Sequence, residues 1–271
     1  MLKNAHILLK NEYQKCFEKV KEDGYYACFA EEKLHHSLQV LGAGNFIIRH
    51  ESWFANKTQD FIDLCKTAVL LHDIARFEEI TVRYLRNVKI DHGEEGAKKL
   101  KLMPEFNDIR ITLPIKHHGH VKEDFYRDAE FLNIKDTKLA DEVEHIFFLI
   151  RDADKIANFN IVCNEREKFL PVFIPQKDEV SDQRSIITPE VKDDFLRCKT
   201  VNYALRRTQA DHCLAFISWF FDINYQSSVV FCERLDLINK MFDGLKFYQN
   251  DENLAQDLKN LVIKYLTNIK S

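Results

Sequence analysis

The sequence predicts an all-α protein, and three observations support this prediction. Apolar residues recur at helical spacing along most of the chain, as in the series from Phe61 to Ala75. The 271 residues include only seven glycines and five prolines, although β-rich folds use many glycines in their turns. The best strand candidate, LPVFIP at Leu170–Pro175, is bounded by proline and is more typical of an extended loop.

The expected helices each have an apolar face that also holds polar residues. One such face consists of Glu32, His36, Val40, Ala43 and Ile47. A second runs through Phe61, Leu64, Cys65, Ala68, Leu71, His72 and Ala75. A third consists of Val143, Ile146, Phe147, Ile150, Asp154 and Ala157. Breaks around Pro104 and Pro114 separate the second from the third.

The last third of the chain begins with a predicted long exposed loop from Glu165 to Ser185. A helix is then expected with Thr188 as N-cap and Pro189 at its first position. The apolar segment DHCLAFISWFFDI predicts a further helix, with Asp211 as its N-cap. Its SWFFD stretch, Ser218–Asp222, favours ordinary core packing over a dimer face or a lid on a metal pocket.

Composition excludes several classes of partner. The net charge of −4 is too mild for a nucleic-acid groove or for binding to an anionic membrane. No apolar run reaches the roughly 18–20 residues of a membrane span, and the N-terminus lacks the apolar region of a signal peptide. Seven scattered cysteines without a C-x-x-C pair predict reduced thiols. We therefore expect a cytoplasmic protein.

The stretch AVLLHDIARFEE, residues 68–79, places His72 and Asp73 in an apolar helical pattern. Burying an ionised carboxylate costs several kcal/mol unless a partner offsets its charge. Three solutions are open at this point: a metal ion, a salt-bridge partner, or a helix that ends early.

Further potential metal ligands occur in or beside the apolar segments. They are His36, His92, His117, His118 and Asp154. Imidazoles and carboxylates together are a ligand set for divalent metals. Adjacent helical residues point about 100° apart, so His72 and Asp73 can both reach an ion beside the helix. The three histidines at 92, 117 and 118 can complete a second site that shares Asp73.

These blocks resemble the HD superfamily of metal-dependent phosphohydrolases over about residues 30–160. The matching blocks are H-S-L-x-V at His36, A-V-L-L-H-D-I-A-R at His72-Asp73, H-G-E-E-G-A at His92, H-H at 117–118 and A-D-K-I at Asp154. They follow the order used in that family. The downstream segments RDADK, ITPEV and ISWFFDIN look like those of a bacterial subgroup with generally unassigned substrates. The resemblance implies a single HD-type helical domain over 1–271, with a metal-binding core at about 30–160 and a C-terminal helical extension at about 186–271.

The resemblance also implies one or two divalent ions, chosen from Mn, Fe, Zn, Co, Ni and Mg. The first metal would have the ligands His36, His72, Asp73 and Asp154. The second would have the ligands Asp73, His92, His117 and His118. Some family members use a carboxylate one turn before the first histidine, where this chain has Glu32.

Two ligand positions have close competitors. His35 competes with His36, but His36 shares its face with Val40 and the apolar residues beyond it. Asp152 competes with Asp154, and the two point about 200° apart on a helix. We prefer Asp154 because it lies in line with Ile150, and we expect Asp152 to form a surface salt bridge.

The expected reaction is hydrolysis of a phosphate ester by metal-activated water. Asp73 would orient the nucleophile, while Arg76 and Lys155 would contact the phosphate; Lys116 is a further cation near the histidine pair. The expected substrate is a nucleotide or another small phosphorylated metabolite. Two alternatives are a di-iron oxygenase of the same fold and a non-catalytic regulatory module. The sequence leaves a homodimer open.

Overall fold

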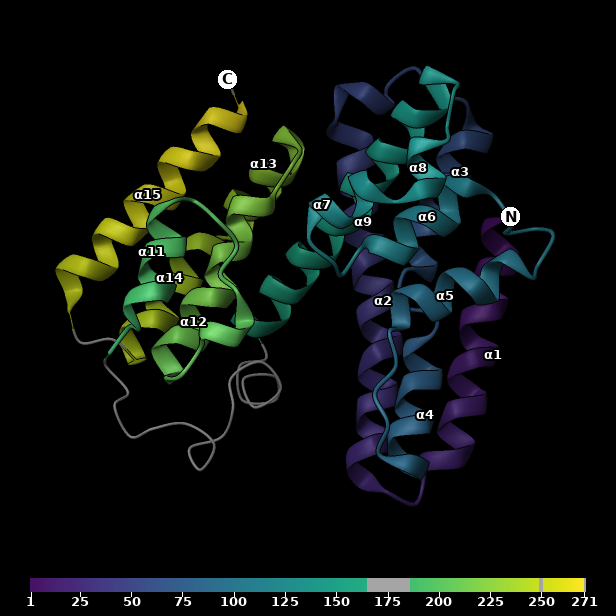
Figure 1. Ribbon diagram of the computed structural model, residues 1–271, viewed down its shortest axis with the longest axis horizontal. Coiled ribbons are helices and arrows are strands. Elements are labelled where there is room, and N and C mark those ends of the chain that lie inside the picture. The colour runs from purple at the N-terminus through teal and green to yellow at the C-terminus, as the bar shows by residue number, and fades with distance from the viewer. Residues whose placement is uncertain (165–185, 249–250, 271) are drawn as a thin grey trace. The chain divides into compact units, whose positions relative to one another are not determined.

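The computed structural model describes residues 1–164, 186–248 and 251–270, and within these ranges the chain is helical without any strand (Figure 1). The all-α prediction is confirmed. The predicted loops at Leu170–Pro175 and Glu165–Ser185 lie outside the described residues. The chain divides into two compact units, residues 1–154 and 155–271. A single domain over 1–271 stays a prediction.

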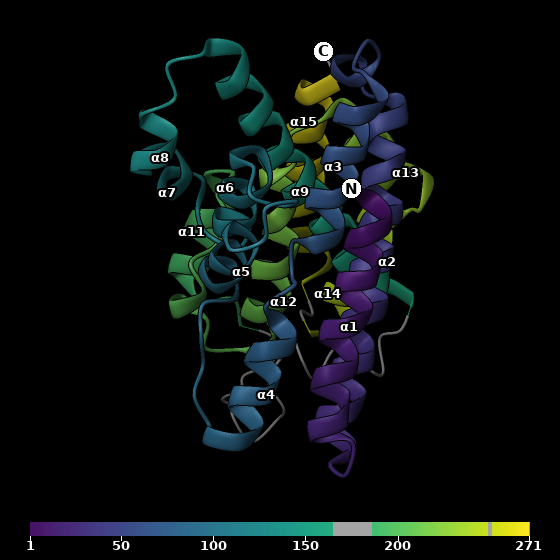
Figure 2. The same cartoon turned by 90° about the vertical axis from the view of Figure 1, so that its right-hand side faces the viewer.

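The first unit begins with two antiparallel helices, α1 at Leu2–Val20 and α2 at Gly24–His50, which pack side by side (Figure 1, Figure 2). Asp23 caps α2 by accepting hydrogen bonds from two backbone N–H groups of its first turn. Helix α3, Gln59–Leu71, follows a short 3₁₀ turn at Ser52–Phe54 and packs against both α1 and α2.

The rest of the first unit consists of shorter helices and the start of a long one. They are α4 at Arg76–Arg86, α5 at His92–Lys101, α6 at Ile109–His117, α7 at Lys122–Arg127, α8 at Ala129–Leu132 and α9 at Thr137–Asn164. Helix α5 packs closely on α6, and α6 also contacts α3. Helix α9 includes the boundary between the two units.

The predicted continuous helix from Phe61 to Ala75 is interrupted. Helix α3 ends at Leu71, residues 72–75 form a turn, and α4 begins at Arg76. The periodicity did not reveal the break, because a single helical turn keeps the apolar residues on the same face. His72 and Asp73 therefore lie in a junction between helices, so an early helix end is part of the answer to the problem of the buried carboxylate.

The predicted apolar faces are buried in the structure. On α2 these buried residues are His36, Val40, Ala43 and Ile47. On α9 they include Val143, Ile146, Phe147 and Ile150. Phe147 stacks on Phe125 with 4.1 Å between ring centroids, next to Leu113 of α6. This packing holds α9 against α6 and α7.

The second unit is also helical over its described residues. Its elements after α9 are α11 at Pro189–Leu196, η3 at Tyr203–Leu205, α12 at Gln209–Ile217, η4 at Ser218–Asp222, α13 at Gln226–Arg234, α14 at Leu237–Tyr248 and α15 at Glu252–Lys270. The predicted start of α11 at Thr188–Pro189 is confirmed. None of the described helices is both long enough and apolar enough to cross a membrane.

The prediction that Asp211 is an N-cap is wrong. Thr208 caps α12, and Asp211 occupies the third helical position of a capping box, where it is fully buried. Its carboxylate also accepts hydrogen bonds from the backbone N–H and the hydroxyl of Thr188. Asp211 thus links the start of α11 to the start of α12.

The SWFFD segment forms the 3₁₀ helix η4 rather than the end of an α-helix. Phe220 stacks on Phe159 at 4.2 Å, and Phe221 meets Tyr265 edge-on at 5.2 Å. Both phenylalanines are buried, in agreement with the prediction of core packing.

The first test concerns Asp211. Replacing it by alanine leaves several buried donors without an acceptor, so Asp211→Ala should lower the free energy of unfolding by about 3 kcal/mol. The exposed Asp257→Ala on α15 is the matched control, with an expected change within about 0.5 kcal/mol. Urea unfolding followed by circular dichroism measures both. Equal stability of the two variants would contradict a role for Asp211 in joining α11 to α12.

Candidate metal centre

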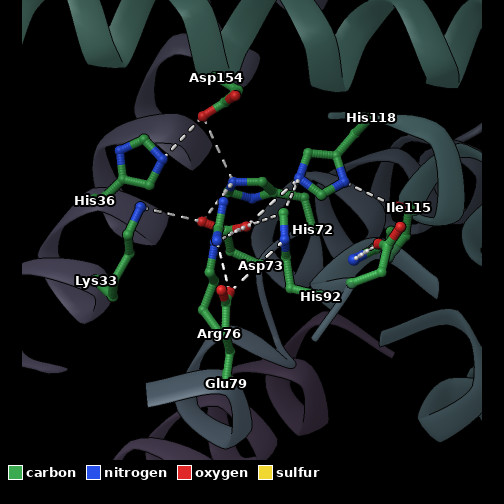
Figure 3. Close-up of polar contacts among 12 residues, drawn as sticks. Lys33, His36, His72, Asp73, Arg76, Glu79, His92, Ile115, His118 and Asp154 are labelled. Carbon is green, nitrogen blue, oxygen red and sulfur yellow. Dashed lines mark hydrogen bonds and ion pairs between the residues drawn. The ribbon is translucent and has the colours of Figure 1, made fainter. Parts of the chain in front are cut away.

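Five segments of the first unit place histidines and aspartates around one point (Figure 3). Helix α2 contributes His36, and the turn after α3 contributes His72 and Asp73. His92 is the first residue of α5, and His118 directly follows the last residue of α6. Asp154 projects toward the cluster from α9.

The first group of possible ligands is His36, His72 and Asp73. Their nearest ligand atoms all lie within 4.8 Å of one another, and all three side chains are buried. Asp154 adjoins this group: its Oδ1 atom lies 2.9 Å from Nε2 of His36 and 3.7 Å from Nε2 of His72. These are the four residues predicted for the first metal.

The second group is Asp73, His92 and His118. The Nε2 atoms of the two histidines lie 3.2 Å apart, and they lie 3.3 Å and 3.4 Å from Oδ1 of Asp73. On the other side of the carboxylate, Oδ2 lies 3.7 Å from Nε2 of His72. Asp73 therefore belongs to both groups, which is the arrangement of a carboxylate that bridges two metals.

The tautomers of two imidazoles leave lone pairs directed into the cluster. Nδ1 of His72 bonds the carbonyl of Val69 at 2.9 Å, and Nδ1 of His118 bonds that of Ile115 at 2.7 Å. Because a carbonyl only accepts, Nδ1 carries the proton in each ring, and a neutral ring then has its lone pair on Nε2. These two Nε2 atoms are therefore set up to bind a cation.

The buried atoms of the cluster that lack a hydrogen-bond partner among the described residues include two acceptors, Nε2 of His72 and Oδ1 of Asp73. Buried polar atoms are nearly always paired in native proteins. A divalent cation next to both atoms would satisfy them, and the surrounding nitrogen and carboxylate ligands suit such an ion. The residues present therefore fit a bound metal.

Burial and neighbouring charges set the protonation states that a metal requires. Burial lowers the pKa of His72 to about 4 and that of His92 to about 2, so both imidazoles are neutral at pH 7. Burial alone would raise the pKa of Asp73, but the charges of Arg76 and Lys33 outweigh it and lower that pKa well below its usual value. Burial acts in the same way on Asp154, where the hydrogen bond with His36 outweighs it and lowers the pKa.

Two cations flank Asp73. Nε of Arg76 lies 3.3 Å from Oδ1, and Nζ of Lys33 lies 3.5 Å from Oδ2. Glu79 holds the guanidinium of Arg76 through a 2.6 Å bond. Lys33 and Glu79 were not among the residues predicted for the site. Lys33 lies one turn before His36, so the helical spacing was a signal that could have found it.

A glycine allows α5 to approach α6. A Cβ atom on Gly93 would lie 2.5 Å from the carbonyl oxygen of Lys116, closer than real contacts allow. The missing side chain therefore lets the first turn of α5 rest directly on α6. This close approach brings His92 next to His118.

Two of the predicted site residues, His117 and Lys155, are not brought into these groups. Nε2 of His117 lies 2.7 Å from Oδ2 of Asp128, which also pairs with Lys116 at 2.8 Å. Lys155 pairs with Asp222 at 2.7 Å. His117 as a ligand and Lys155 as a phosphate contact stay predictions, and these contacts do not support them.

The competing residues also have defined environments. His35 is exposed whereas His36 is buried, which fits the choice of His36. Asp152 is fully buried, so the prediction of a surface salt bridge for it is wrong. Glu32 contacts the thiol of Cys28 at 3.4 Å and is not a member of either ligand group.

The fold and this cluster define an all-α domain built around histidines and aspartates that could hold a metal ion. Residues 34–158 match the family model of the HD domain, and the match contains every member of both ligand groups. Residues 34–158 thus form an HD domain, as the sequence blocks indicated. No curated protein and no solved structure gives a significant match to this chain.

The buried histidines predict an acid-sensitive metal-free protein. His72 has an ordinary pKa of 6.5 when unfolded and about 4 when folded. Between these values the unfolded chain binds the additional proton, so the stability present above pH 6.5 is lost as the pH falls toward 4. Urea unfolding of chelated protein from pH 7.5 to pH 4.5 measures this slope.

A His72→Gln variant should show a shallower loss of stability over the same pH range, since one titrating group is gone. The exposed His50→Gln variant on α2 is the matched control and should keep the wild-type slope. If His72→Gln also kept the wild-type slope, burial of a neutral His72 would be refuted.

Proposed function

We propose that the protein is a metal-dependent phosphohydrolase that cleaves a phosphate ester in a nucleotide or another small phosphorylated metabolite. The observation that carries this proposal is the pair of ligand groups that share Asp73, with Arg76 and Lys33 beside them. Metal ligands and cations at one point match the needs of phosphoryl transfer, in which positioning and electrostatic stabilisation dominate.

Bound divalent ions would lower the pKa of water toward neutrality and offset charge on the phosphoryl oxygens. The protein's own residues do the rest. The ionised Asp73 accepts a hydrogen bond from the attacking water and orients it. Arg76, held by Glu79, and Lys33 present N–H donors to the phosphate oxygens. Both cations are partly exposed, so a substrate phosphate can reach them.

The same ligands would also suit two irons, as in the oxygenase alternative. Arg76 and Lys33 favour the phosphohydrolase, because they offer charge-assisted hydrogen bonds to an anionic group. None of the seven cysteines is paired in a disulfide, which supports the cytoplasmic location proposed for a metabolite-processing enzyme. We propose a small-molecule substrate rather than a nucleic-acid polymer or a membrane.

Metal dependence is the first functional test. Chelated protein is reloaded separately with Mn, Fe, Zn, Co, Ni or Mg, and each form is screened against nucleotides, sugar phosphates and nitrophenyl phosphate esters. We expect phosphate release only from reloaded protein. Asp73→Ala should abolish it, because the shared ligand is lost. Asp60→Ala, an exposed change at the start of α3, is the matched control and should retain activity. Hydrolysis that survives chelation would refute the proposal.

The cations make a separate prediction about substrate binding. Arg76→Gln and Lys33→Gln should each lower kcat/KM by about 10²-fold, since each removes a charged donor that faces the phosphate. Metal content, measured by inductively coupled plasma mass spectrometry, should stay at the wild-type level. Arg83→Gln changes an exposed arginine on the same helix as Arg76 and should leave kcat/KM unchanged. Wild-type kcat/KM in both cation variants would exclude them from the phosphate site.

A further inference from the structure

We propose that Arg151 is a positioning residue for the second ligand group: it holds the turn His117–His120 and thereby keeps His118 directed at Asp73. The inference rests on the proposed metal site and adds a residue to it. Arg151 lies on α9, contains none of the ligand atoms, and is almost entirely buried, with 6% of its surface exposed.

The contacts of Arg151 with this turn are specific. Its Nη1 atom donates to the carbonyl oxygen of His118 at 2.9 Å and to that of His117 at 3.4 Å, and it also donates to that of His120. The guanidinium carbon lies 5.1 Å from the ring centroid of Phe147, one turn earlier on α9. The arginine therefore has a fixed position from which it reaches three carbonyls of one turn.

The turn lies at the C-terminal end of α6, where its carbonyl groups favour a nearby cation. Helix α6 ends at His117, and the last carbonyls of a helix have no partner within that helix. They also form the negative end of the helix dipole. A buried guanidinium satisfies these carbonyls and offsets their partial charge. The planar arginine side chain can keep such a geometry better than a flexible lysine.

This turn controls the direction of the His118 ring. The backbone of the turn sets where the side chain begins, and the bond from Nδ1 to the Ile115 carbonyl sets its rotation. Nε2 then lies 3.4 Å from Asp73 and 3.2 Å from Nε2 of His92. Residues that orient a metal ligand through hydrogen bonds of this kind affect the affinity for the metal without contacting the ion.

Helix α9 thus serves both ligand groups through two residues. Asp154 contacts His36 and His72 of the first group. Arg151, three residues earlier, contacts the turn that carries His118 of the second group. None of the three carbonyl acceptors belongs to the first group, so loss of Arg151 should affect the second group selectively.

The test uses the 271-residue chain with Arg151→Gln and Arg151→Lys. Calorimetric titration with Co²⁺, together with the visible absorption of bound Co²⁺, measures each binding step. We expect the second Co²⁺ to bind about 10–100-fold more weakly in both variants, while the first keeps its wild-type affinity. Lysine should rescue little, because its flexible side chain lacks the planar guanidinium that packs near the Phe147 ring and fixes the donor atom in place.

A second measurement needs no metal. Diethyl pyrocarbonate modifies accessible imidazoles, and mass spectrometry locates the modified residues. In metal-free wild-type protein the buried His118 should react slowly; in the Arg151 variants it should react faster, while the buried His72 stays protected. Arg110→Gln is the matched control, since Arg110 pairs with Asp108 and Glu142 at the other end of α6. This variant should leave both the affinity for the second Co²⁺ and the rate of His118 modification unchanged.

The outcomes separate this inference from the proposed function. A folded Arg151→Gln or Arg151→Lys protein with wild-type binding of the second Co²⁺ and a protected His118 would overturn the inference. If the wild type binds two Co²⁺ ions but hydrolyses no phosphate ester, the proposed function fails and the positioning role stands. If the wild type binds fewer than two Co²⁺ ions, the rate at which diethyl pyrocarbonate modifies His118 alone decides whether Arg151 positions this histidine. Should Arg151→Gln fail to fold, the same criteria apply to Arg151→Lys.

Discussion

The structure of the first unit depends on one constraint, which is that an ionised carboxylate, Asp73, is enclosed between two sets of imidazoles. Removing such a charge from water is costly unless opposite charge surrounds it. Arg76 and Lys33 supply part of that charge from α4 and α2. The lone pairs directed at the same point, and the Oδ1 atom of Asp73 that accepts no hydrogen bond, favour a further cation there. A divalent metal is the species that meets both requirements.

Several local features of the backbone and side chains position the ligands of this centre. The end of α3 at Leu71 places two consecutive ligands in a turn, where their side chains diverge toward different partners. Gly93 lets α5 rest on α6, so that His92 meets His118. Carbonyls behind the rings fix the tautomers of His72 and His118. Each feature restricts one ligand before any ion binds, which reduces the conformational cost of binding.

Much of this could be predicted from the sequence, because apolar periodicity reports directly which helix faces are buried. It identified the α2 face that selects His36 over His35, and the α9 face that includes Asp154. It could not reveal the break after Leu71, which leaves the apolar pattern intact. It also could not pair residues distant in sequence. His117 meets Asp128 and Lys155 meets Asp222 through tertiary contacts, and spacing alone contains no information about them. Lys33 was missed because a lysine on a helix usually marks solvent.

The most direct test of the central claim is anomalous X-ray diffraction from crystals of the protein grown with Mn²⁺. The account predicts two anomalous peaks, one on each side of the Asp73 carboxylate. One would lie among His36, His72 and Asp154, and the other between His92 and His118. A single peak would reduce the centre to one metal and remove the bridging role of Asp73. The absence of any peak at the cluster, in crystals where Mn²⁺ binds elsewhere on the chain, would contradict the metal centre itself.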